Sequence, residues 1–374
     1  MSGIYIHIPF CKQACHYCDF HFSTSRKHQQ RMVDAICNEI KLRQTEIGKS
    51  ISTIYFGGGT PSLLSKDQLD QILKQIQNLF DIEENAEITL EANPDDLNEE
   101  KLTGFKQGGI NRLSIGVQSF FDRDLKWMNR AHNAEEAQYS LEIAQKYFDN
   151  ISLDLIYGVP GMSEKRWIEN LDRAIALKIP HLSCYALTVE PKTVLANKIS
   201  QGKTEPVEDK LCRAHYDILT EKMKAAGFVN YEFSSFGKTG FFSQNNLGYW
   251  FGKPYLGIGP GAHSFTENQR SWNIAHNIHY MKGIENAERD FKTETLSITD
   301  QFNEYIMTRL RTQWGISMVE IESDFGSKFA DHVLKESAGF LQKDLLTREE
   351  NHLVITPKGK FLTDGIAAEL FWVE

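Results

Sequence analysis

The sequence predicts an α/β protein made of a partial (β/α)6 barrel, an accessory region and a small C-terminal α+β domain of winged-helix type. The barrel is predicted because strand-like apolar runs alternate six times with helix-like segments before residue 190. The smaller domain is predicted because this repeat gives way to short helices and a terminal hairpin. We expect residues 1–230 to form the barrel, 231–290 the accessory region and 291–374 the C-terminal domain.

Six strands and their helices account for the first half of the chain. The strands are IYIHIP, STIYFGGG, AEITLEANP, INRLSIGVQ, NISLDLIYG and HLSCYALT. The helices are expected near 25–47, 66–80, 97–107, 135–148 and 164–178. Six units with short connections favour a barrel over two separate sheets, and barrels of this kind carry function in the loops that follow their strands.

The second half has a different pattern. A helix at roughly 208–226 precedes a region rich in glycine and aromatic residues, which we expect to cover the barrel mouth. The segment 298–316 is typical of an amphipathic helix, and LLTREENHLVITPKG is typical of a hairpin. Helices followed by a hairpin suggest a winged helix, for which we expect a structural or docking role.

Composition indicates an ordinary globular protein, with 41% hydrophobic and 24% charged residues. No apolar run approaches the roughly 20 residues of a membrane span, and MSGIYIHIPF lacks the features of a signal peptide, so we expect a cytoplasmic protein. The net charge of −9 argues against nucleic acid as a partner. Six cysteines in such a chain are not a disulfide framework, and Cys37, Cys184 and Cys212 have the apolar neighbours of core residues.

Three further cysteines, Cys11, Cys15 and Cys18, lie close together in a polar loop after the first strand and are the candidate metal ligands. A structural zinc ion normally takes four protein ligands, and His16 or His21 could supply the fourth. No second pair of cysteines follows at the distance typical of a zinc ribbon. An iron–sulfur cluster is the other interpretation, because three thiolates leave one iron open for a substrate or cofactor.

Polar and glycine residues follow the next strands at the predicted mouth. FGGGTPS ends the second strand, and its glycines permit either close approach of a ligand or tight packing of a turn. Glu91 could bind hydroxyls or an ammonium group, or be a solvated strand end. Arg130 could pair with a carboxylate, and Asp154 lies in an apolar strand where a lone carboxylate is costly, which favours a ligand role.

The cysteine spacing after a first barrel strand, with Tyr17 before the last cysteine, resembles the radical S-adenosylmethionine (SAM) superfamily. The resemblance implies a [4Fe–4S] cluster whose open iron is chelated by SAM, and one-electron cleavage of SAM to a 5′-deoxyadenosyl radical. It further implies that Gly58, Gly59 and Thr60 contact the methionyl amino group and that Ala186 lies near the adenine. The expected SAM-binding residues are Tyr5, Tyr17, Gly58, Gly59, Thr60, Glu91, Gln118, Arg130, Asp154 and Ala186.

The segments YIHIPFC, FGGGTPS, RLSIGVQSF, DLIYGVPG and YALTVEPKT together resemble the oxygen-independent coproporphyrinogen III oxidase-like family over nearly the whole chain. In that family the decarboxylases carry a fourth cysteine two residues after the third. Phe20 occupies this position and resembles the haem-chaperone branch, called HemW-type. The resemblance implies that the chain binds haem and delivers it to a haem-requiring protein, such as a membrane respiratory enzyme, and receives electrons from a donor protein.

One segment departs from that branch. The branch usually reads His-Asn-x-x-Tyr-Trp, with the His implicated in haem binding, whereas this chain has Asn245 at the His position. Asn is not a strong iron ligand, so haem would bind through another His, such as His263, or by packing on Tyr249 and Trp250. An aromatic lid over the barrel is an equal alternative for these two rings.

Two other functions are compatible with the sequence. One is the decarboxylation of coproporphyrinogen III to protoporphyrinogen IX, against which Phe20 counts. The other is a non-catalytic binding protein whose cysteine loop is stabilised by zinc. The sequence predicts no catalytic side chain.

Overall fold

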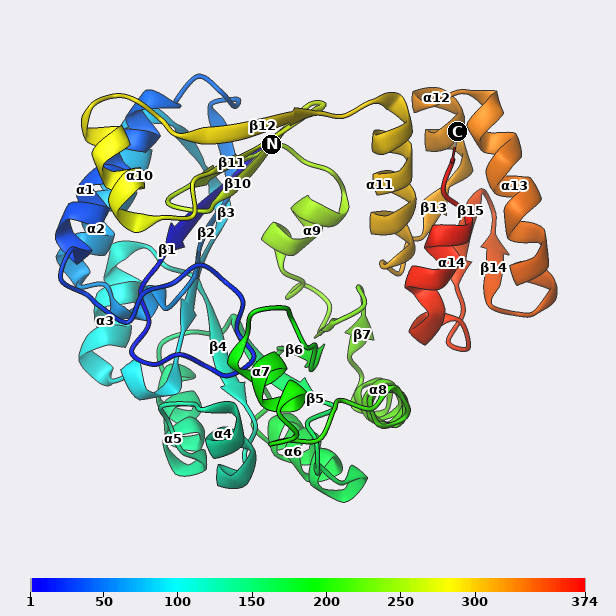
Figure 1. Cartoon of the computed structure of the whole chain (residues 1–374), viewed down its shortest axis with the longest axis horizontal. Coiled ribbons are helices and arrows are strands. Elements are labelled where there is room, and N and C mark those ends of the chain that lie inside the picture. Colours follow the sequence, from blue (N-terminus) through cyan, green and yellow to red (C-terminus); the bar gives the residue numbers. More distant parts are fainter. Residues whose placement is uncertain (1, 374) are drawn as a thin grey trace.

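The computed structural model describes residues 2–373 and confirms the α/β prediction (Figure 1). The first six strands form a parallel array, from β1 paired with β2 to β5 paired with β6. These strands are β1 (Ser2–Ile8), β2 (Ser50–Gly58), β3 (Asp81–Ala92), β4 (Arg112–Gln118), β5 (Ile151–Tyr157) and β6 (His181–Ala186). The helices between them are α1 (Gln29–Leu42), α2 (Lys66–Leu79), α3 (Glu99–Gly108), α4 (Asp122–Met128), α5 (Ala134–Ala144) and α6 (Glu164–Ala176), with short 3-10 turns at Pro61–Leu63 and Pro94–Asp96.

Local signals fix the ends of several helices. Helix α2 begins with a capping box in which Ser65 and Gln68 satisfy each other's backbone N–H groups. Helix α5 begins in the same way at Asn133 and Glu136. Helix α3 ends at Gly109, whose φ of 100° only glycine adopts without strain. These caps fix the ends of helices that were expected near 66–80, 97–107 and 135–148.

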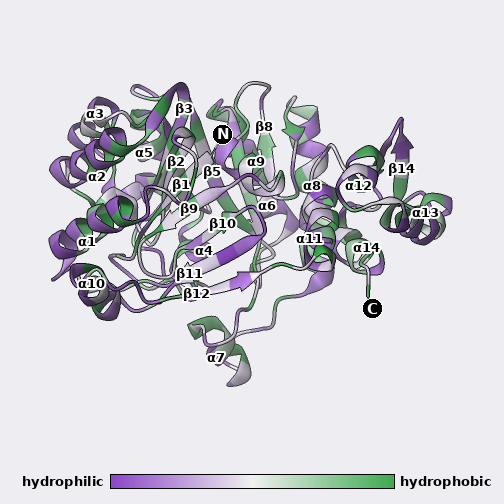
Figure 2. Cartoon of the chain, turned by 90° about the horizontal axis from the view of Figure 1, so that it is seen from above, coloured by the Kyte–Doolittle hydropathy of each residue, from purple (hydrophilic) through white to green (hydrophobic). Residues whose placement is uncertain are grey.

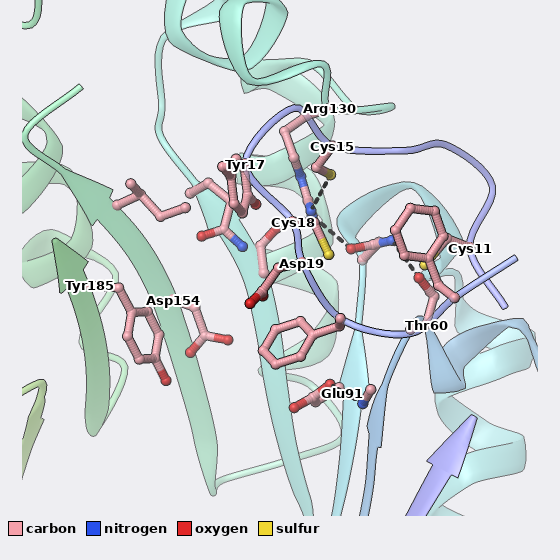
Figure 3. Close-up of a pocket in the computed structure, with 18 of the residues that line it drawn as sticks. Cys11, Cys15, Tyr17, Cys18, Asp19, Thr60, Glu91, Arg130, Asp154 and Tyr185 are labelled. Atoms are coloured by element: carbon pink, nitrogen blue, oxygen red, sulfur yellow. Dashed lines mark hydrogen bonds between the residues drawn. The ribbon is translucent and has the colours of Figure 1, made fainter. Parts of the chain in front are cut away.

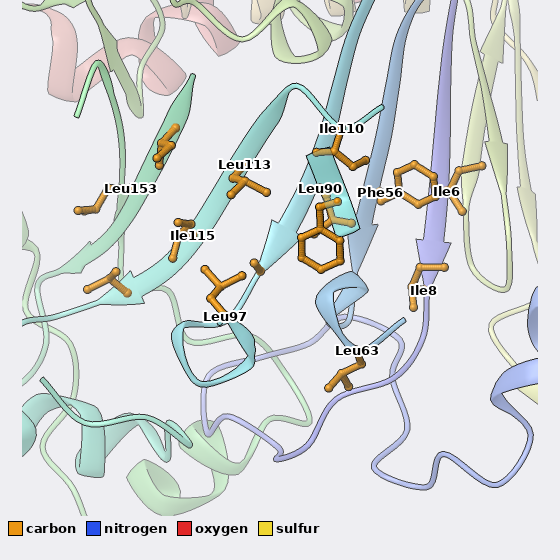
Figure 4. Packing of buried hydrophobic residues seen from close by; sticks show 14 of the residues in the cluster. Ile6, Ile8, Phe56, Leu63, Leu90, Leu97, Ile110, Leu113, Ile115 and Leu153 are labelled. Atoms are coloured by element: carbon orange, nitrogen blue, oxygen red, sulfur yellow. The ribbon is translucent and has the colours of Figure 1, made fainter. Parts of the chain in front are cut away.

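Alternate residues of each strand face opposite sides, and the two sides differ in chemistry. One set packs against the covering helices and forms the core; it includes Ile6, Phe56, Leu90, Leu113 and Leu153, all fully buried (Figure 4). The other set faces the barrel interior and is largely polar. The covering helices turn hydrophilic faces outward (Figure 2). The strands therefore form a stable layer with the helices while leaving a polar interior for a site.

Strands that follow the barrel in the chain extend the sheet at both edges. At one edge β9 (Tyr255–Ile258) pairs in parallel with β1, followed by β10 (His263–Thr266), β11 (Gln269–Asn273) and β12 (Phe291–Thr295). At the other edge β8 (Ser235–Gly237) and β7 (Val229–Asn230) follow β6. The result is one 12-stranded sheet. Helices α7 (Val194–Ser200), α8 (Asp209–Ala225), α9 (Gln244–Trp250) and α10 (Asn277–Glu285) belong to the same half of the chain.

The expectation that residues 231–290 cover the barrel mouth is wrong for α9. The backbone N–H groups of Gln244 and Asn245 donate to the carboxylate of Glu87, at 3.0 and 3.1 Å. Helix α9 also shares a cavity with Gly3 and Thr53, near the starts of β1 and β2. It therefore closes the end where the strands begin, because a buried carboxylate there binds the N-terminus of the helix. Within residues 231–290, Asn277 does contact the mouth side: its Oδ1 lies 2.7 Å from Nε2 of His21 in the cysteine loop.

The C-terminal part has its own small hydrophobic core, centred on Phe302, Phe329 and Val333. It comprises α11 (Ile298–Leu310), β13 (Ile316–Ser317), α12 (Met318–Asp324), α13 (Ser327–Gln342), β14 (Leu346–Glu349), β15 (His352–Ile355) and α14 (Thr363–Glu369). Strands β14 and β15 pair antiparallel, as the predicted hairpin requires. The helix predicted over 298–316 ends earlier, at Leu310, and Gly315 follows with a φ of 66°.

The predicted domain boundary at residue 291 falls inside the large sheet, because β12 pairs with β11. The other boundaries stay predictions. None of the helices within residues 2–373 is both long enough and apolar enough to cross a membrane.

Candidate functional site

A cavity of about 410 Å³ opens at the C-terminal ends of the parallel strands (Figure 3). Cys11, Cys15 and Cys18 line one side of it, and residues from the ends of β2 to β6 line the rest. Of the ten predicted SAM-binding residues, nine line this cavity: Tyr17, Gly58, Gly59, Thr60, Glu91, Gln118, Arg130, Asp154 and Ala186.

The cysteine loop is held by backbone contacts at its base and by the end of α4. The Cys11 N–H donates to the Ser23 carbonyl at 3.1 Å, which closes the loop at its base. The side chain of Asn129 donates to the Ala14 carbonyl at 2.7 Å, and the His16 N–H donates to the Met128 carbonyl at 3.1 Å. The loop is therefore positioned by groups that do not bind a metal.

The two histidines of the loop point to other partners. His16 Nδ1 lies 2.7 Å from the Trp127 carbonyl oxygen, and His21 Nε2 lies 2.7 Å from Asn277 Oδ1. Neither histidine lines the cavity. Within residues 2–373, no group of three or more His, Cys, Asp or Glu side chains is placed to hold a single metal ion. The zinc interpretation thus lacks its fourth ligand.

The donor set fits a [4Fe–4S] cluster better. A cluster spreads its ligands over different irons, so its thiolates lie farther apart than around one zinc ion. Three soft thiolates from one loop facing an open cavity satisfy this requirement.

Arg130 is the cation of the cavity wall and is fixed by three contacts. Its Nη2 donates to Asn93 Oδ1 at 2.6 Å and to the Gly116 carbonyl at 2.7 Å. Its Nη1 lies 3.4 Å from Cys15 Sγ. The guanidinium is therefore oriented beside a thiol, where it can compensate the charge of a thiolate or of an anionic ligand.

Two partly buried carboxyl groups line the opposite part of the cavity. Tyr55 donates to Glu91 Oε1 at 2.8 Å, and the Gly58 N–H donates to Oε2 at 3.1 Å. Burial raises the pKa of Glu91 to about 7. Burial also raises the pKa of Asp154, which accepts hydrogen bonds from Ser114 and Ser152. Both groups can accept hydrogen bonds from a polar ligand.

Steric crowding is one reason for the glycines at the end of β2. A Cβ on Gly59 would lie 2.7 Å from the Ile8 and Phe10 carbonyl oxygens. Gly58 has a φ of 101°, and a Cβ there would lie 2.4 Å from the His7 ring. The packing alternative therefore holds for both residues, and both also line the cavity.

Gln118 has a strained backbone at the site, because its φ of 69° is unusual for a residue other than glycine. The irregularity in the pairing of β4 with β5 lies at this point. Strain of this kind persists where the surrounding structure enforces it, often at functional sites.

Tyr5 is the one predicted SAM residue that does not line the cavity. It lies below the cavity floor, where its ring stacks on Tyr55 at a centroid distance of 6.1 Å. Its hydroxyl lies 3.2 Å from His7 Nδ1, and His7 Nε2 lies 2.8 Å from the His21 carbonyl oxygen. Tyr5 therefore supports the floor and, through His7, the cysteine loop.

Several lining residues were not predicted from the sequence. They include Gln13, Asp19, Asn93, Ser114, Gly116, Tyr185 and Glu190. Ser114 and Tyr185 could have been found from strand alternation, because they occupy interior positions of β4 and β6. Asn93 was harder to predict, because the sequence indicates only that it directly follows the strand that carries Glu91.

The residues considered for haem lie away from this cavity. Asn245 is buried in α9 at the opposite end of the barrel. His263 is exposed on β10 and stacks on Trp272 at a centroid distance of 5.6 Å. Tyr249 and Trp250 line a separate cavity beside α11 and do not form a lid over the mouth. Cys37, Cys184 and Cys212 are buried, as predicted.

Comparison with known proteins identifies the family. Residues 5–174 match the radical SAM superfamily, and residues 296–362 match the HemN C-terminal domain. The chain is 36% identical to the heme chaperone HemW of Bacillus subtilis (strain 168), over 98% of both chains. The chain belongs to the HemW family. HemW of Escherichia coli (strain K12) is 33% identical over all of this chain and 98% of its own.

A solved structure shares the HemW-family fold seen here. Coproporphyrinogen III oxidase (HemN) from Escherichia coli, described as a radical SAM enzyme, superposes with a TM-score of 0.84. The match covers 99% of this chain and 89% of that chain, at 23% identity. At this identity the likeness establishes a common fold.

Proposed function

We propose that this protein is a haem chaperone that carries a [4Fe–4S] cluster and SAM in the mouth cavity. The observation that carries the proposal is the likeness to proteins named heme chaperone HemW, which spans 98% of both chains for the Bacillus subtilis relative. A haem chaperone binds haem and passes it to an acceptor. Haem-requiring proteins, including membrane respiratory enzymes, are the proposed acceptors, and a redox protein is the proposed source of electrons for the cluster.

The cavity residues have distinct proposed roles. Cys11, Cys15 and Cys18 would hold the cluster, and Arg130 would fix an anionic group beside it. The carboxyls of Glu91 and Asp154 and the strained Gln118 would bind polar groups of SAM. The rest of SAM would be contacted by Tyr17, Gly58, Gly59, Thr60 and Ala186. When bound, the cluster and SAM together supply one-electron radical chemistry.

Phe20 argues for the chaperone over the decarboxylase. It lines the cavity with 66% of its surface exposed, at the place where the decarboxylases carry a fourth cysteine. A phenyl ring supplies no thiolate. Decarboxylation of coproporphyrinogen III is the second candidate, supported by the fold shared with HemN.

One experiment separates the two functions. Anaerobically reconstituted protein is incubated with reductant, SAM and coproporphyrinogen III, and a portion of the same sample is titrated with haem. We expect saturable haem binding and no protoporphyrinogen IX. Catalytic formation of protoporphyrinogen IX would overturn the chaperone assignment.

The cluster ligands need a matched control. Replacing Cys11, Cys15 and Cys18 together by Ala should abolish the bound iron and sulfide. Cys37→Ala, which removes a buried thiol distant from the loop in sequence, should leave both unchanged. Iron retained by the triple variant would refute the assigned ligands.

A further inference from the structure

A chain of buried hydrogen bonds crosses the barrel interior and ends at Asp154, whose carboxyl lines the mouth cavity (Figure 3). Its other members are Ser152, His181 and Tyr231, and all three side chains are fully buried. None of the three is among the described residues that line the cavity. The chain therefore lies behind the cavity wall.

The register of the strands brings these groups together. Ser152 and Asp154 lie two residues apart on β5, so they face the same side of the sheet. On β6, His181 is the partner of Ser152, and Ser183 is the partner of Asp154. Tyr231 directly follows β7, and its side chain meets His181 across a separation of 50 residues.

Printed distances connect every member of the chain. Ser152 Oγ donates to Asp154 Oδ1 at 3.2 Å and lies 2.8 Å from His181 Nδ1. His181 Nε2 lies 2.8 Å from the Tyr231 hydroxyl oxygen. The N–H of Ser243, the N-cap residue of α9, donates to the same oxygen at 3.2 Å. Hydrogen-bonded groups therefore extend from the start of α9 to the mouth cavity.

When Asp154 is ionised, the chain has one direction. A carboxylate only accepts, so Ser152 gives its proton to Asp154 and accepts the Nδ1 proton of His181. Burial and the nearby charge of Arg112 hold the pKa of His181 well below its usual range. The neutral ring therefore has a free lone pair on Nε2, which accepts from Tyr231. Every donor points toward the carboxylate.

The surroundings of Asp154 act on its charge in opposite ways. Burial raises its pKa, and the hydrogen bonds from Ser114 and Ser152 oppose this rise. The titratable and charged groups that face it from β2, β3, β4 and β6 are Tyr55, Glu91, Arg112, Cys184 and Tyr185. Arg112 is the cation of this set and favours the ionised form, whereas a charge on Glu91 opposes it.

We propose that His181 is a positioning residue of the mouth site: through Ser152 it holds the Asp154 carboxylate toward a hydroxyl or ammonium group of the bound ligand. Tyr231 fixes the ring of His181. Because serine donors occupy some of its acceptor positions, the carboxylate keeps one orientation, and its remaining positions accept from the ligand. The inference rests on the proposed binding of SAM, which carries groups of both kinds.

The test measures SAM binding to the full-length, cluster-loaded protein by anaerobic equilibrium dialysis, from mildly acidic to mildly alkaline pH. Ser152→Ala and His181→Phe should each weaken binding about three- to tenfold near neutral pH. The fall in affinity toward acid should also begin at higher pH than in the unmodified protein, because Asp154 loses a donor that favours its ionised form. Glu91 is present in every variant, so the displacement of the pH profile reports on Asp154.

Two further variants make the test specific. His181→Asn, whose amide N–H takes the place of Nδ1–H, should bind SAM more tightly than His181→Phe. His215→Phe is the matched control, because His215 is equally buried but accepts from the Gly158 N–H and is not among the described residues that line the cavity. It should leave the affinity and its pH dependence unchanged. Thermal unfolding of each variant checks folding, and Ser152→Ala, which removes a single oxygen, is the mildest change.

The outcomes separate this inference from the proposed function. Unchanged SAM affinity and pH dependence in Ser152→Ala and His181→Phe, with stability alone reduced, would refute the positioning role, because the chain would then support only the fold. Absence of SAM binding by the unmodified, cluster-loaded protein would overturn the proposed SAM site itself.

Discussion

Glu91 links three parts of the mouth through one carboxyl group. It accepts hydrogen bonds from Tyr55 and from Gly58, and Asp154 is a second acid nearby. Burial favours its protonated form, so the pKa rises from 4.5 to about 7. At neutral pH the carboxyl group is therefore partly protonated, when it can donate a hydrogen bond, and partly ionised, when it can only accept.

This pKa predicts a pH-dependent stability difference between the unmodified protein and Glu91→Gln. A raised acid pKa means that the folded state binds more protons than the unfolded state, so Glu91 lowers stability progressively as pH rises from 4.5 to about 7. Gln carries no such penalty. The free energy of unfolding is measured by urea titration of cluster-free protein. Between pH 4.5 and about 7, its value for Glu91→Gln minus its value for the unmodified protein should rise by up to about 3 kcal/mol. If the difference in unfolding free energy between the two proteins does not change with pH, Glu91 has an ordinary pKa.

Asn245→His tests haem binding at the level of one residue. Because Asn245 is 5% exposed at the start of α9, a His at this position has little access to a ligand the size of haem, and we expect unchanged haem affinity. The larger ring should cost about 1–3 kcal/mol of stability through overpacking. Haem titration and thermal unfolding measure the two effects. Tighter haem binding with the spectrum of a histidine-ligated iron would show that position 245 reaches bound haem.

At the scale of elements, the end of α4 positions the cysteine loop. Asn129 ends this helix with a φ of 59° and donates to the Ala14 carbonyl. Its side chain therefore connects a helix terminus to the segment between Cys11 and Cys15.

Two substitutions at Asn129 separate its roles. Asn129→Gly keeps the left-handed backbone and removes the side-chain donor, whereas Asn129→Ala also strains the backbone by about 1–2 kcal/mol. Both should lower the iron bound per chain after reconstitution, and only the Ala variant should be clearly less stable. Full iron content in both variants would show that the loop positions itself.

Glu87 positions α9, as Asn129 positions the cysteine loop. Its carboxylate accepts from the first N–H groups of the helix and lies 3.7 Å from Arg112 Nε, with both side chains buried. Glu87→Ala should cost about 3–5 kcal/mol in urea unfolding, because it leaves the Arg112 charge buried without a partner. The exposed Glu84→Ala, on the same strand, should cost less than about 0.5 kcal/mol. Equal costs would show that Glu87 does not anchor α9.

At the scale of the whole molecule, the core and the mouth cavity are built from opposite faces of the same strands. The apolar face packs against α1 to α6, and the polar face lines the interior. The cysteine loop adds Phe10 to the core before its first cysteine, but its three thiols do not belong to it. Folding of the barrel should therefore not depend on the cluster.

Removal of the cluster tests this separation. Chelation of iron should leave the far-UV circular dichroism unchanged and the unfolding cooperative, while proteolysis becomes faster within residues 11–23. Collapse of the helical signal on chelation would show that the metal supports the fold itself, as in small zinc domains.

The sequence by itself determined the six βα units, the cysteine loop and the place of nine of the ten expected SAM-binding residues at the mouth. These features are local: strand alternation, helix caps and cysteine spacing are set by neighbours in the chain, and parallel strands bring their C-terminal ends to one edge. Tertiary structure alone decided that α9 closes the far end, that β9 pairs with β1, and that Tyr5 lies below the cavity. These depend on contacts between distant segments, such as Glu87 with α9, whose partner no local pattern reveals.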